Sequence, residues 1–272
     1  MDELNNPAGR LLAIIKEGGS HGKDEQCIKV WSTLLKVPLQ ETPVLLQRIG
    51  HVMSLPDRIA EAIYSISDVN HDIYLKWHSR VMAGVQMTNF QNPWKSFIDR
   101  FDAEIMYGIE ICADTLSRSC PEKVIPQSTL NELLSKIAEL QKEFSEHDLP
   151  PNLAQFICQQ LEEIKQAINE YPYLGTKPLE AALEKSIGKI VVCPQIYKNC
   201  QKSTYGKKFW EFMGYLAISV TITTGAIQIG KDVVNLLPAK TAASTAEIEI
   251  EKPEVDSKAS NETTSDSITI KT

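Results

Sequence analysis

The chain has 272 residues, 43% of them hydrophobic, which is enough for a packed core in one large domain or two small ones. Its formal net charge of −7 argues against a nucleic-acid partner, because neutralising phosphates requires a basic face. Six cysteines without a Cys-x-x-Cys pair favour reduced core thiols, as at Cys112 and Cys158, over a disulfide or zinc framework.

Short amphipathic helices are predicted through the first part of the chain. Asn6-Pro7 supplies a cap and a first-turn proline for a helix that Gly18-Gly19 ends. A second helix follows from Asp24, and Thr42-Pro43 and Leu55-Pro56 open two more. The segment 18–23 lacks the spacing of a phosphate-binding loop and is interpreted as a turn. Residues 1–6 have neither the basic nor the apolar region of a secretory signal peptide, so we expect the body in the cytoplasm.

Two longer helices are predicted next, because apolar side chains recur every three or four residues. One begins at Asn70 and carries Trp77, and the other runs from Pro93 to Pro121. The second, at about 25 residues, is the clearest helix of the chain and a candidate central strut.

An antiparallel helix pair is predicted after residue 126. Thr129 and Glu132 have the spacing of a capping box, and Pro150-Pro151 begins the partner helix. Residues 129–170 contain eight acidic residues and three lysines, which we interpret as a solvated surface rather than a docking face for a basic partner. A further helix opens near Pro178 and ends before Pro194.

The segment 209–237, ended by Pro238, organises the predictions about function. Its uncharged part, 212–230, approaches the roughly 20 residues that a membrane-spanning helix needs. Residues 218–223 alternate as a half-buried strand would, but a longer stripe at spacings of three and four residues favours a helix. The stripe consists of Gly214, Ala217, Thr221, Thr224, Gln228 and Lys231.

Small and hydroxyl-bearing residues along such a stripe let membrane helices approach one another, so we favour membrane association by a narrow margin. The apolar residues of the run contribute only about −2 to −4 kcal/mol toward insertion, which makes a lone span marginal. The alternative is a helix that packs on the body or in an oligomer. Four lysines precede the run and are candidate contacts for lipid head groups, or else a solvated helix end: Lys198, Lys202, Lys207 and Lys208.

Residues 239–272 contain no aromatic residue and are rich in Thr, Ala, Ser, Glu and Lys, which predicts a disordered acidic tail. The expected organisation is therefore a helical body (1–205), an apolar C-terminal helix (206–238) and a tail (239–272).

No catalytic, metal or cofactor motif is evident. His71 and His78 share one predicted helix but form no His-Glu-x-x-His motif, and no nucleophile elbow or dinucleotide fingerprint occurs. Asp99 and Asp102 are explained as the polar side of the long helix. We therefore expect no cofactor and no enzymatic activity; the enzymatic alternative is a hydrolase whose acids or histidines converge from separate helices.

The residues Asn-Pro-Ala-Gly-Arg-Leu-Leu at 6–12, Val30-Trp31 and the apolar segment near the end resemble a family of uncharacterised bacterial helical proteins. The resemblance extends over most of residues 5–237. It implies an all-helical protein and carries no established activity or site residues.

The expected fold is an all-α multi-helix bundle with a C-terminal apolar helix, a candidate for membrane insertion, and a disordered tail. The expected function is a non-enzymatic interaction or effector protein, attached to the cell membrane through that helix, as a defence or toxin effector would be. Its expected partners are membrane lipids and a second copy or another protein. The alternative is a soluble cytoplasmic scaffold or adaptor.

Overall fold

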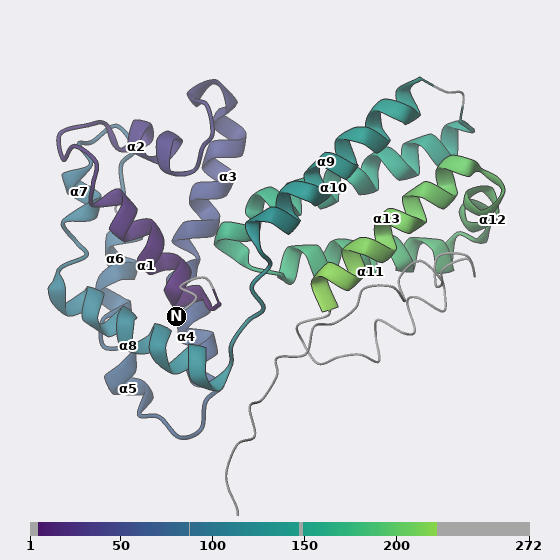
Figure 1. Ribbon diagram of the computed structural model, residues 1–272. Helices are drawn as coiled ribbons and strands as arrows, with labels where there is room; N and C mark the ends of the chain where they lie inside the picture. Colours follow the sequence, from purple (N-terminus) through teal and green to yellow (C-terminus); the bar gives the residue numbers. More distant parts are fainter. Residues whose placement is uncertain (1–4, 87, 147–148, 222–272) are drawn as a thin grey trace, which may run out of the picture.

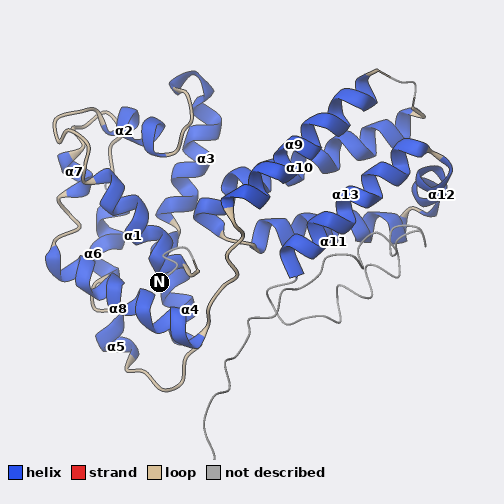
Figure 2. Ribbon diagram, in the orientation of Figure 1, coloured by secondary structure: helices blue, strands red, loops and turns tan. Residues whose placement is uncertain are grey.

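The computed structural model describes residues 5–86, 88–146 and 149–221, and these residues form an all-α protein (Figures 1 and 2). Within these ranges no strand occurs; Gln26 and Pro93 meet only in an isolated bridge. The predicted fold class is therefore confirmed for this part of the chain. The expected tail, 239–272, lies outside the described residues.

The helices form two groups, one on each side of Figure 1. The first, which we call the N-lobe, comprises residues 5–119. Its helices are α1 (Pro7–Gly18), α2 (Cys27–Leu34), the 3-10 helix η1 (Leu39–Glu41), α3 (Thr42–Met53), α4 (Leu55–Tyr64), α5 (His71–Tyr74), α6 (His78–Gln86), α7 (Lys95–Ile98) and α8 (Ala103–Ser119). The second, the C-lobe, comprises residues 125–221. Its helices are α9 (Gln127–Ser145), α10 (Pro151–Leu174), α11 (Lys177–Val192), α12 (Pro194–Lys202) and α13 (Thr204–Thr221).

Each lobe has its own hydrophobic core, and the two cores differ in composition. An aromatic group lies in the N-lobe, where the ring of Trp31 is 5.3 Å from that of Trp94 and 5.1 Å from that of Phe97. The indole N–H of Trp94 donates to Gly18 O at 2.8 Å, which satisfies a carbonyl at the end of α1. The C-lobe core consists mainly of leucine, isoleucine and phenylalanine side chains from α9, α10, α11 and α13.

Both of the longer helices predicted in the N-lobe are interrupted. The helix expected from Asn70 divides into α5 and α6, and the break places Trp77 against α8, where a side chain at Gly108 would meet its ring. The helix expected from Pro93 divides into α7 and α8. There the Asp102 carboxylate accepts from Ile105 N–H at 2.9 Å and starts a new helix. The predicted 25-residue strut was therefore wrong.

The predicted capping box is also absent. Helix α9 begins at Gln127 without a side-chain cap, so Thr129 lies inside its first turn. Glu132 instead accepts a hydrogen bond from the Tyr215 hydroxyl of α13 at 2.6 Å. The Glu132 carboxylate, which the sequence pattern assigned to a local cap, thus makes a tertiary contact instead.

Helix α10 connects the two lobes. At 24 residues it extends about 36 Å, and its C-terminal end reaches the N-lobe. Tyr171 belongs to the C-lobe core, whereas Tyr173 packs in the N-lobe core and its hydroxyl donates to Leu35 O. Gly175 then ends the helix at a positive φ of 70°, which favours glycine. The two lobes are thus joined by packed side chains as well as by the segment 120–124.

Candidate functional site

The described part of the uncharged run, residues 212–221, belongs to α13, which lies inside the C-lobe rather than apart from it (Figure 1). Phe209, Met213 and Leu216 are fully buried in the C-lobe core. The small residues Gly214 and Ala217 are buried as well. These two members of the stripe are therefore covered by the chain's own helices.

A close approach of backbones explains a small residue at the start of α13. A β-carbon built on Gly206 would lie 2.5 Å from Cys200 Cα and 2.7 Å from Cys200 C, both of them backbone atoms. Only a residue without a side chain lets α13 fold back so closely on α12. Small residues on this helix thus have a role in tertiary packing.

Polar contacts hold α13 to α9. Besides the Tyr215 hydrogen bond to Glu132, Lys208 Nζ lies 2.6 Å from Glu143 Oε2, and Lys136 Nζ lies 4.9 Å from the centre of the Tyr215 ring. Burial and the adjacent Glu132 carboxylate raise the pKa of Tyr215 to about 12. The hydroxyl therefore stays protonated and donates at any physiological pH.

A buried lysine lies at the C-terminal end of α13. Lys123, from the segment between the lobes, is 8% exposed and donates to Ser219 O. Burial lowers its pKa to about 8, although the Glu180 carboxylate opposes this shift. The ammonium group satisfies a carbonyl of the last turn and places a positive charge at the negative end of the helix dipole.

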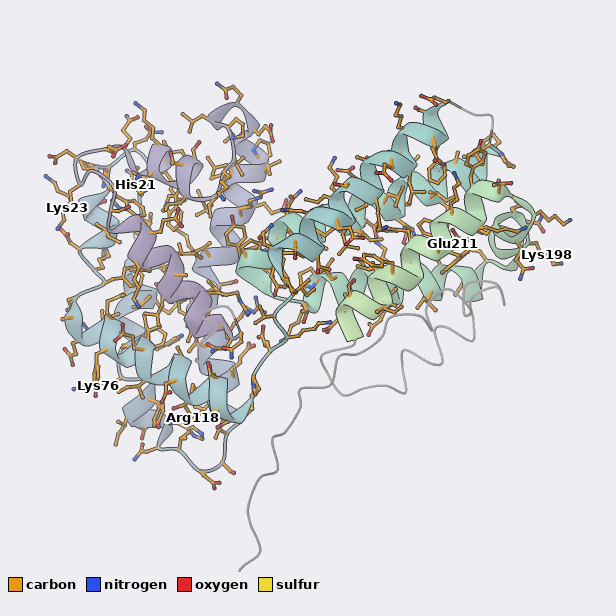
Figure 3. All side chains as sticks on the ribbon, in the orientation of Figure 1. His21, Lys23, Lys76, Arg118, Lys198 and Glu211 are labelled. Carbon is orange, nitrogen blue, oxygen red and sulfur yellow. The ribbon has the colours of Figure 1, made fainter. Side chains whose placement is uncertain are left out.

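The four lysines proposed as lipid contacts lie in different environments. Lys198 and Lys202 are exposed on α12 and Lys207 on α13, and Figure 3 shows Lys198 at the end of the C-lobe farthest from the N-lobe. Lys208 is paired with Glu143. The exposed basic end of the C-lobe therefore consists of three lysines.

The remaining stripe residues cannot be placed on this helix. Outside the described part of the structure lie the Thr221 side chain and residues Thr224, Gln228 and Lys231. Among the helices that the structure does describe, every one is too short or too polar to cross a bilayer.

Several acids of the α9–α10 pair lie next to lysines of the same chain. Glu143 contacts Lys208, Glu163 lies 2.8 Å from Lys185, and Glu132 lies 3.4 Å from Lys136. These pairs reduce the negative potential that a basic partner would meet. The arrangement favours the interpretation of this pair as a solvated surface.

The titratable residues considered for catalysis make separate contacts in the N-lobe. His71 Nε2 is 2.9 Å from Ile66 O, and His78 Nε2 is 2.9 Å from Asp57 Oδ1. Asp99 pairs with Lys23, whereas Asp102 caps α8 and pairs with Arg80. Within the described ranges no three His, Cys, Asp or Glu side chains are grouped so that they could hold a metal ion.

The cysteines are all free, and they divide equally by exposure: Cys27, Cys112 and Cys200 are buried, and Cys120, Cys158 and Cys193 are exposed. The prediction of a core position is confirmed for Cys112 and wrong for Cys158. Burial raises the pKa of each buried thiol to about 11. The buried thiols are therefore unreactive at neutral pH.

The lobe junction contains charged residues that the motif search did not single out. Arg10 is 1% exposed, and its Nη1 lies 2.6 Å from Glu122 Oε2. Arg58 Nη2 donates to Leu174 O at 3.1 Å across the junction. An arginine among the apolar residues of a short helix, as in residues 6–12, is the sequence signal that could have indicated a buried ion pair.

No protein-family model matches this chain, and no curated protein or solved structure matches it. That outcome is consistent with the resemblance noted above, which carries no established activity. Any functional conclusion therefore depends on the geometry of the lobes and their junction.

Proposed function

We propose that the protein is a non-enzymatic helical scaffold or adaptor in which the C-terminal helix packs on the body. The burial of α13 carries this proposal: its bulky side chains and its small ones both face the chain's own core. A helix that is apolar on most of its circumference is expected to be buried in protein or in lipid. Here protein supplies that environment as far as residue 220.

The non-enzymatic form of the proposal is supported by the separate contacts of four titratable side chains: His71, His78, Asp99 and Asp102. A hydrolytic site needs two or more such groups around one substrate-sized cavity. Each of these four side chains is instead bonded to a backbone carbonyl, a helix N-terminus or an opposite charge. Their contacts are those of structural residues.

Fractionation of cells that express the full chain tests the proposal. We expect the protein in the supernatant after membranes are washed with carbonate and pelleted. We also expect the amides of α13 in the purified protein to exchange hydrogen as slowly as those of α10, because both helices contribute to one core. A carbonate-resistant pellet, or α13 amides that exchange as fast as those of an unfolded chain, would refute it.

Membrane association remains the second candidate function, and two observations favour it. The uncharged run continues to Gly230, beyond the described residues, and Lys198, Lys202 and Lys207 are exposed together near the start of α13. In this form, the protein is an effector whose C-terminal segment inserts, or whose basic end contacts anionic lipids while the body stays in the cytoplasm.

Vesicle sedimentation separates the two candidates. A membrane effector should bind phosphatidylserine vesicles more tightly than neutral ones, and replacing the three lysines by glutamine should weaken binding by about 1 kcal/mol per lysine. If binding is observed, the double variant Thr221→Leu with Thr224→Leu distinguishes a plain anchor from an assembly. An anchor tolerates the added apolar area, whereas an assembly packed through threonines loses its oligomer.

A further inference from the structure

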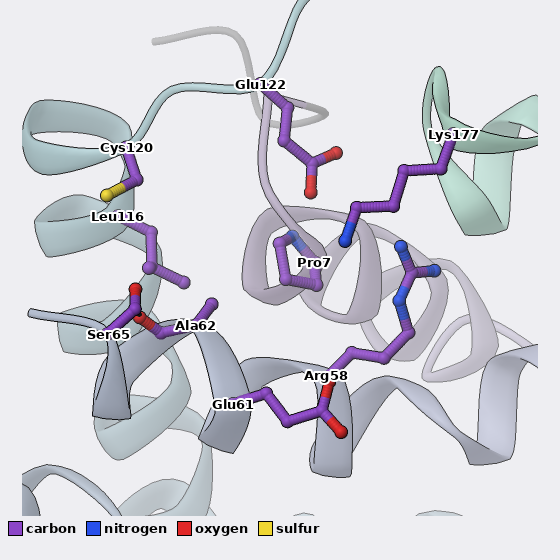
Figure 4. Close-up of a pocket in the computed structure, with 9 residues that line it drawn as sticks. All are labelled: Pro7, Arg58, Glu61, Ala62, Ser65, Leu116, Cys120, Glu122 and Lys177. Atoms are coloured by element: carbon purple, nitrogen blue, oxygen red, sulfur yellow. Dashed lines mark hydrogen bonds between the residues drawn. The ribbon is translucent and has the colours of Figure 1, made fainter. Parts of the chain in front are cut away.

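A pocket of about 340 Å³ opens at the junction of the two lobes (Figure 4). The N-lobe contributes residues of α1, α4 and α8, among them Arg58, and the C-lobe contributes Lys177, the first residue of α11. Glu122 lies between them on the connecting segment. The pocket therefore exists only where both lobes are folded and docked.

Two cationic groups point toward each other inside this pocket. Figure 4 shows the Arg58 guanidinium and the Lys177 ammonium approaching one another near Pro7. Arg58 Nη1 is buried and has no hydrogen-bond partner among the described residues, although Nη2 donates to Leu174 O. A buried donor without a partner is unfavourable, and more so when it is charged. The arrangement lacks an acceptor between the two cations.

The carboxylates that line the pocket offset this deficit only in part. Glu122, which lines the pocket, is already paired with Arg10 at 2.6 Å. Glu61 also borders the pocket, but it is exposed to solvent. Burial lowers the pKa of Arg58 and the positive charge of Arg10 adds to this effect, whereas the carboxylates of Glu122 and Glu61 oppose it. Burial and the charge of Arg10 act against a charged guanidinium, and an anion would relieve both.

The N-terminal ends of two helices border the same pocket. Pro7 is the first residue of α1 and Lys177 the first of α11, and both line it. Thr176, which precedes α11, makes no side-chain cap bond. Helix N-termini carry partial positive charge and favour anions. At α1 the Asn6 side chain already accepts from Gly9 N–H, so the uncapped N-terminus of α11 supplies this contribution beside the two side chains.

One wall of the pocket is apolar. Ala62 and Leu116 line the side away from the cationic groups, and Pro7 lies between the two sides (Figure 4). Pockets of this size that combine an apolar wall with a few convergent polar groups are typical of small-molecule sites. A ligand that fills the space would place an anionic group near Arg58 and Lys177 and an apolar group near Leu116.

We propose that this junction pocket binds a small phosphate monoester with an apolar substituent, and that the phosphate bridges Arg58 of the N-lobe and Lys177 of the C-lobe. A phosphate presents three oxygens in different directions, which suits donors that approach from two lobes. A carboxylate presents two oxygens in one plane and suits a single arginine fork. The apolar substituent lies against Ala62 and Leu116.

Calorimetric titration of the full chain, in buffer free of phosphate and sulfate, tests the proposal with phenyl phosphate as the probe. We expect saturable binding of one molecule per chain and a rise in the melting midpoint that grows with ligand concentration. Inorganic phosphate and benzoate should bind more weakly, and phenol should not bind. No saturable binding of phenyl phosphate up to about 10 mM would overturn the proposal.

Two lysine variants locate the site. Lys177 is exposed, so Lys177→Gln should leave the fold intact while weakening phenyl phosphate binding about tenfold to a hundredfold. Lys198→Gln, an equally exposed change at the far end of the C-lobe, should bind like the unmodified chain. Equal losses in the two variants, or none in Lys177→Gln, would overturn the assignment.

Two further comparisons test the remaining parts of the proposal. Arg58→Gln should weaken binding similarly; it also removes the bond to Leu174 O, so Lys177→Gln decides the outcome if Arg58→Gln does not fold. Inorganic phosphate that binds as tightly as phenyl phosphate would refute the apolar part of the assignment. Benzoate that binds as tightly would refute the preference for phosphate.

Discussion

Replacing Gly206 by alanine should destabilise the C-lobe, although alanine is the better helix former. The new methyl carbon would lie 2.5 Å from Cys200 Cα and 2.7 Å from Cys200 C, whereas β-carbons in proteins essentially never come within 3.0 Å of such atoms. The neighbouring atoms belong to backbone, so a side-chain rotation cannot relieve the clash. Helices α12 and α13 must therefore move apart, and the fully buried Cys200 and Phe209 move with them.

The magnitude follows from two opposing effects. Overpacking a well-packed core typically destabilises by about 1–3 kcal/mol, and contact with rigid backbone places this site near the upper end. Because alanine has a higher helix propensity than glycine, about 0.5–1 kcal/mol of this destabilisation is offset. The expected net loss is about 2 kcal/mol, or a melting midpoint lower by roughly 4–8 °C.

Gly188→Ala in α11 is the matched control, because a methyl carbon there meets nothing within 4 Å. It should raise the free energy of unfolding by about 0.5–1 kcal/mol. Thermal melts of both full-length variants, followed by far-ultraviolet circular dichroism in reducing buffer, measure the two shifts. If Gly206→Ala stabilised the protein as Gly188→Ala does, the close approach of α12 and α13 would be refuted.

Three further predictions concern single side chains. Because burial lowers the pKa of Lys123 from 10.5 to about 8, the unfolded chain binds more protons between these pH values. As pH rises through that window, the free energy of unfolding of the unmodified protein should therefore increase by up to about 3 kcal/mol relative to that of Lys123→Met, as measured by urea titrations. A difference between the two proteins that does not change with pH would contradict the burial of the ammonium. Asp102→Ala should lower the free energy of unfolding by about 1 kcal/mol through loss of the α8 cap, whereas Asp102→Asn should keep most of the stability that the cap contributes. Equal losses of stability in the two variants would argue against capping. Phe209→Ala should destabilise by about 3–5 kcal/mol, whereas Lys208→Met, which removes a partly exposed ion pair, should change stability by less than about 1 kcal/mol; similar effects would contradict the orientation of α13.

Local chemistry allowed much of the fold to be predicted. Helices begin at or next to Pro7, Pro43, Pro56 and Pro151, as expected from the preference of proline for a first turn. Asn6 caps α1 through a 2.8 Å bond to Gly9 N–H, which involves neighbouring residues only. The breaks near Trp77 and Asp102 were not predicted, because apolar periodicity continues across both while contacts with other helices decide where the chain turns.

The candidate sites depended far more on tertiary contacts. Local patterns predicted a helix for the uncharged run that begins at Phe212, and the described part of it, to residue 221, is helical. They did not indicate what covers the helix, because a core and a bilayer accept the same apolar side chains. Nothing in the sequence pattern brings Arg58 and Lys177 together, since they are far apart in the chain and meet only when α10 docks the two lobes.

The sequence by itself thus determined the all-helical class, most helix starts and the uncharged character of the C-terminal run, because each depends on residues within about one or two helical turns. Only the tertiary structure decided that Gly214 and Ala217 are buried in the C-lobe, that Glu132 bonds Tyr215 instead of capping α9, and that Arg58 and Lys177 share a pocket. Periodicity specifies which side of a helix is apolar, whereas the surface that covers that side is set by packing between residues distant in sequence.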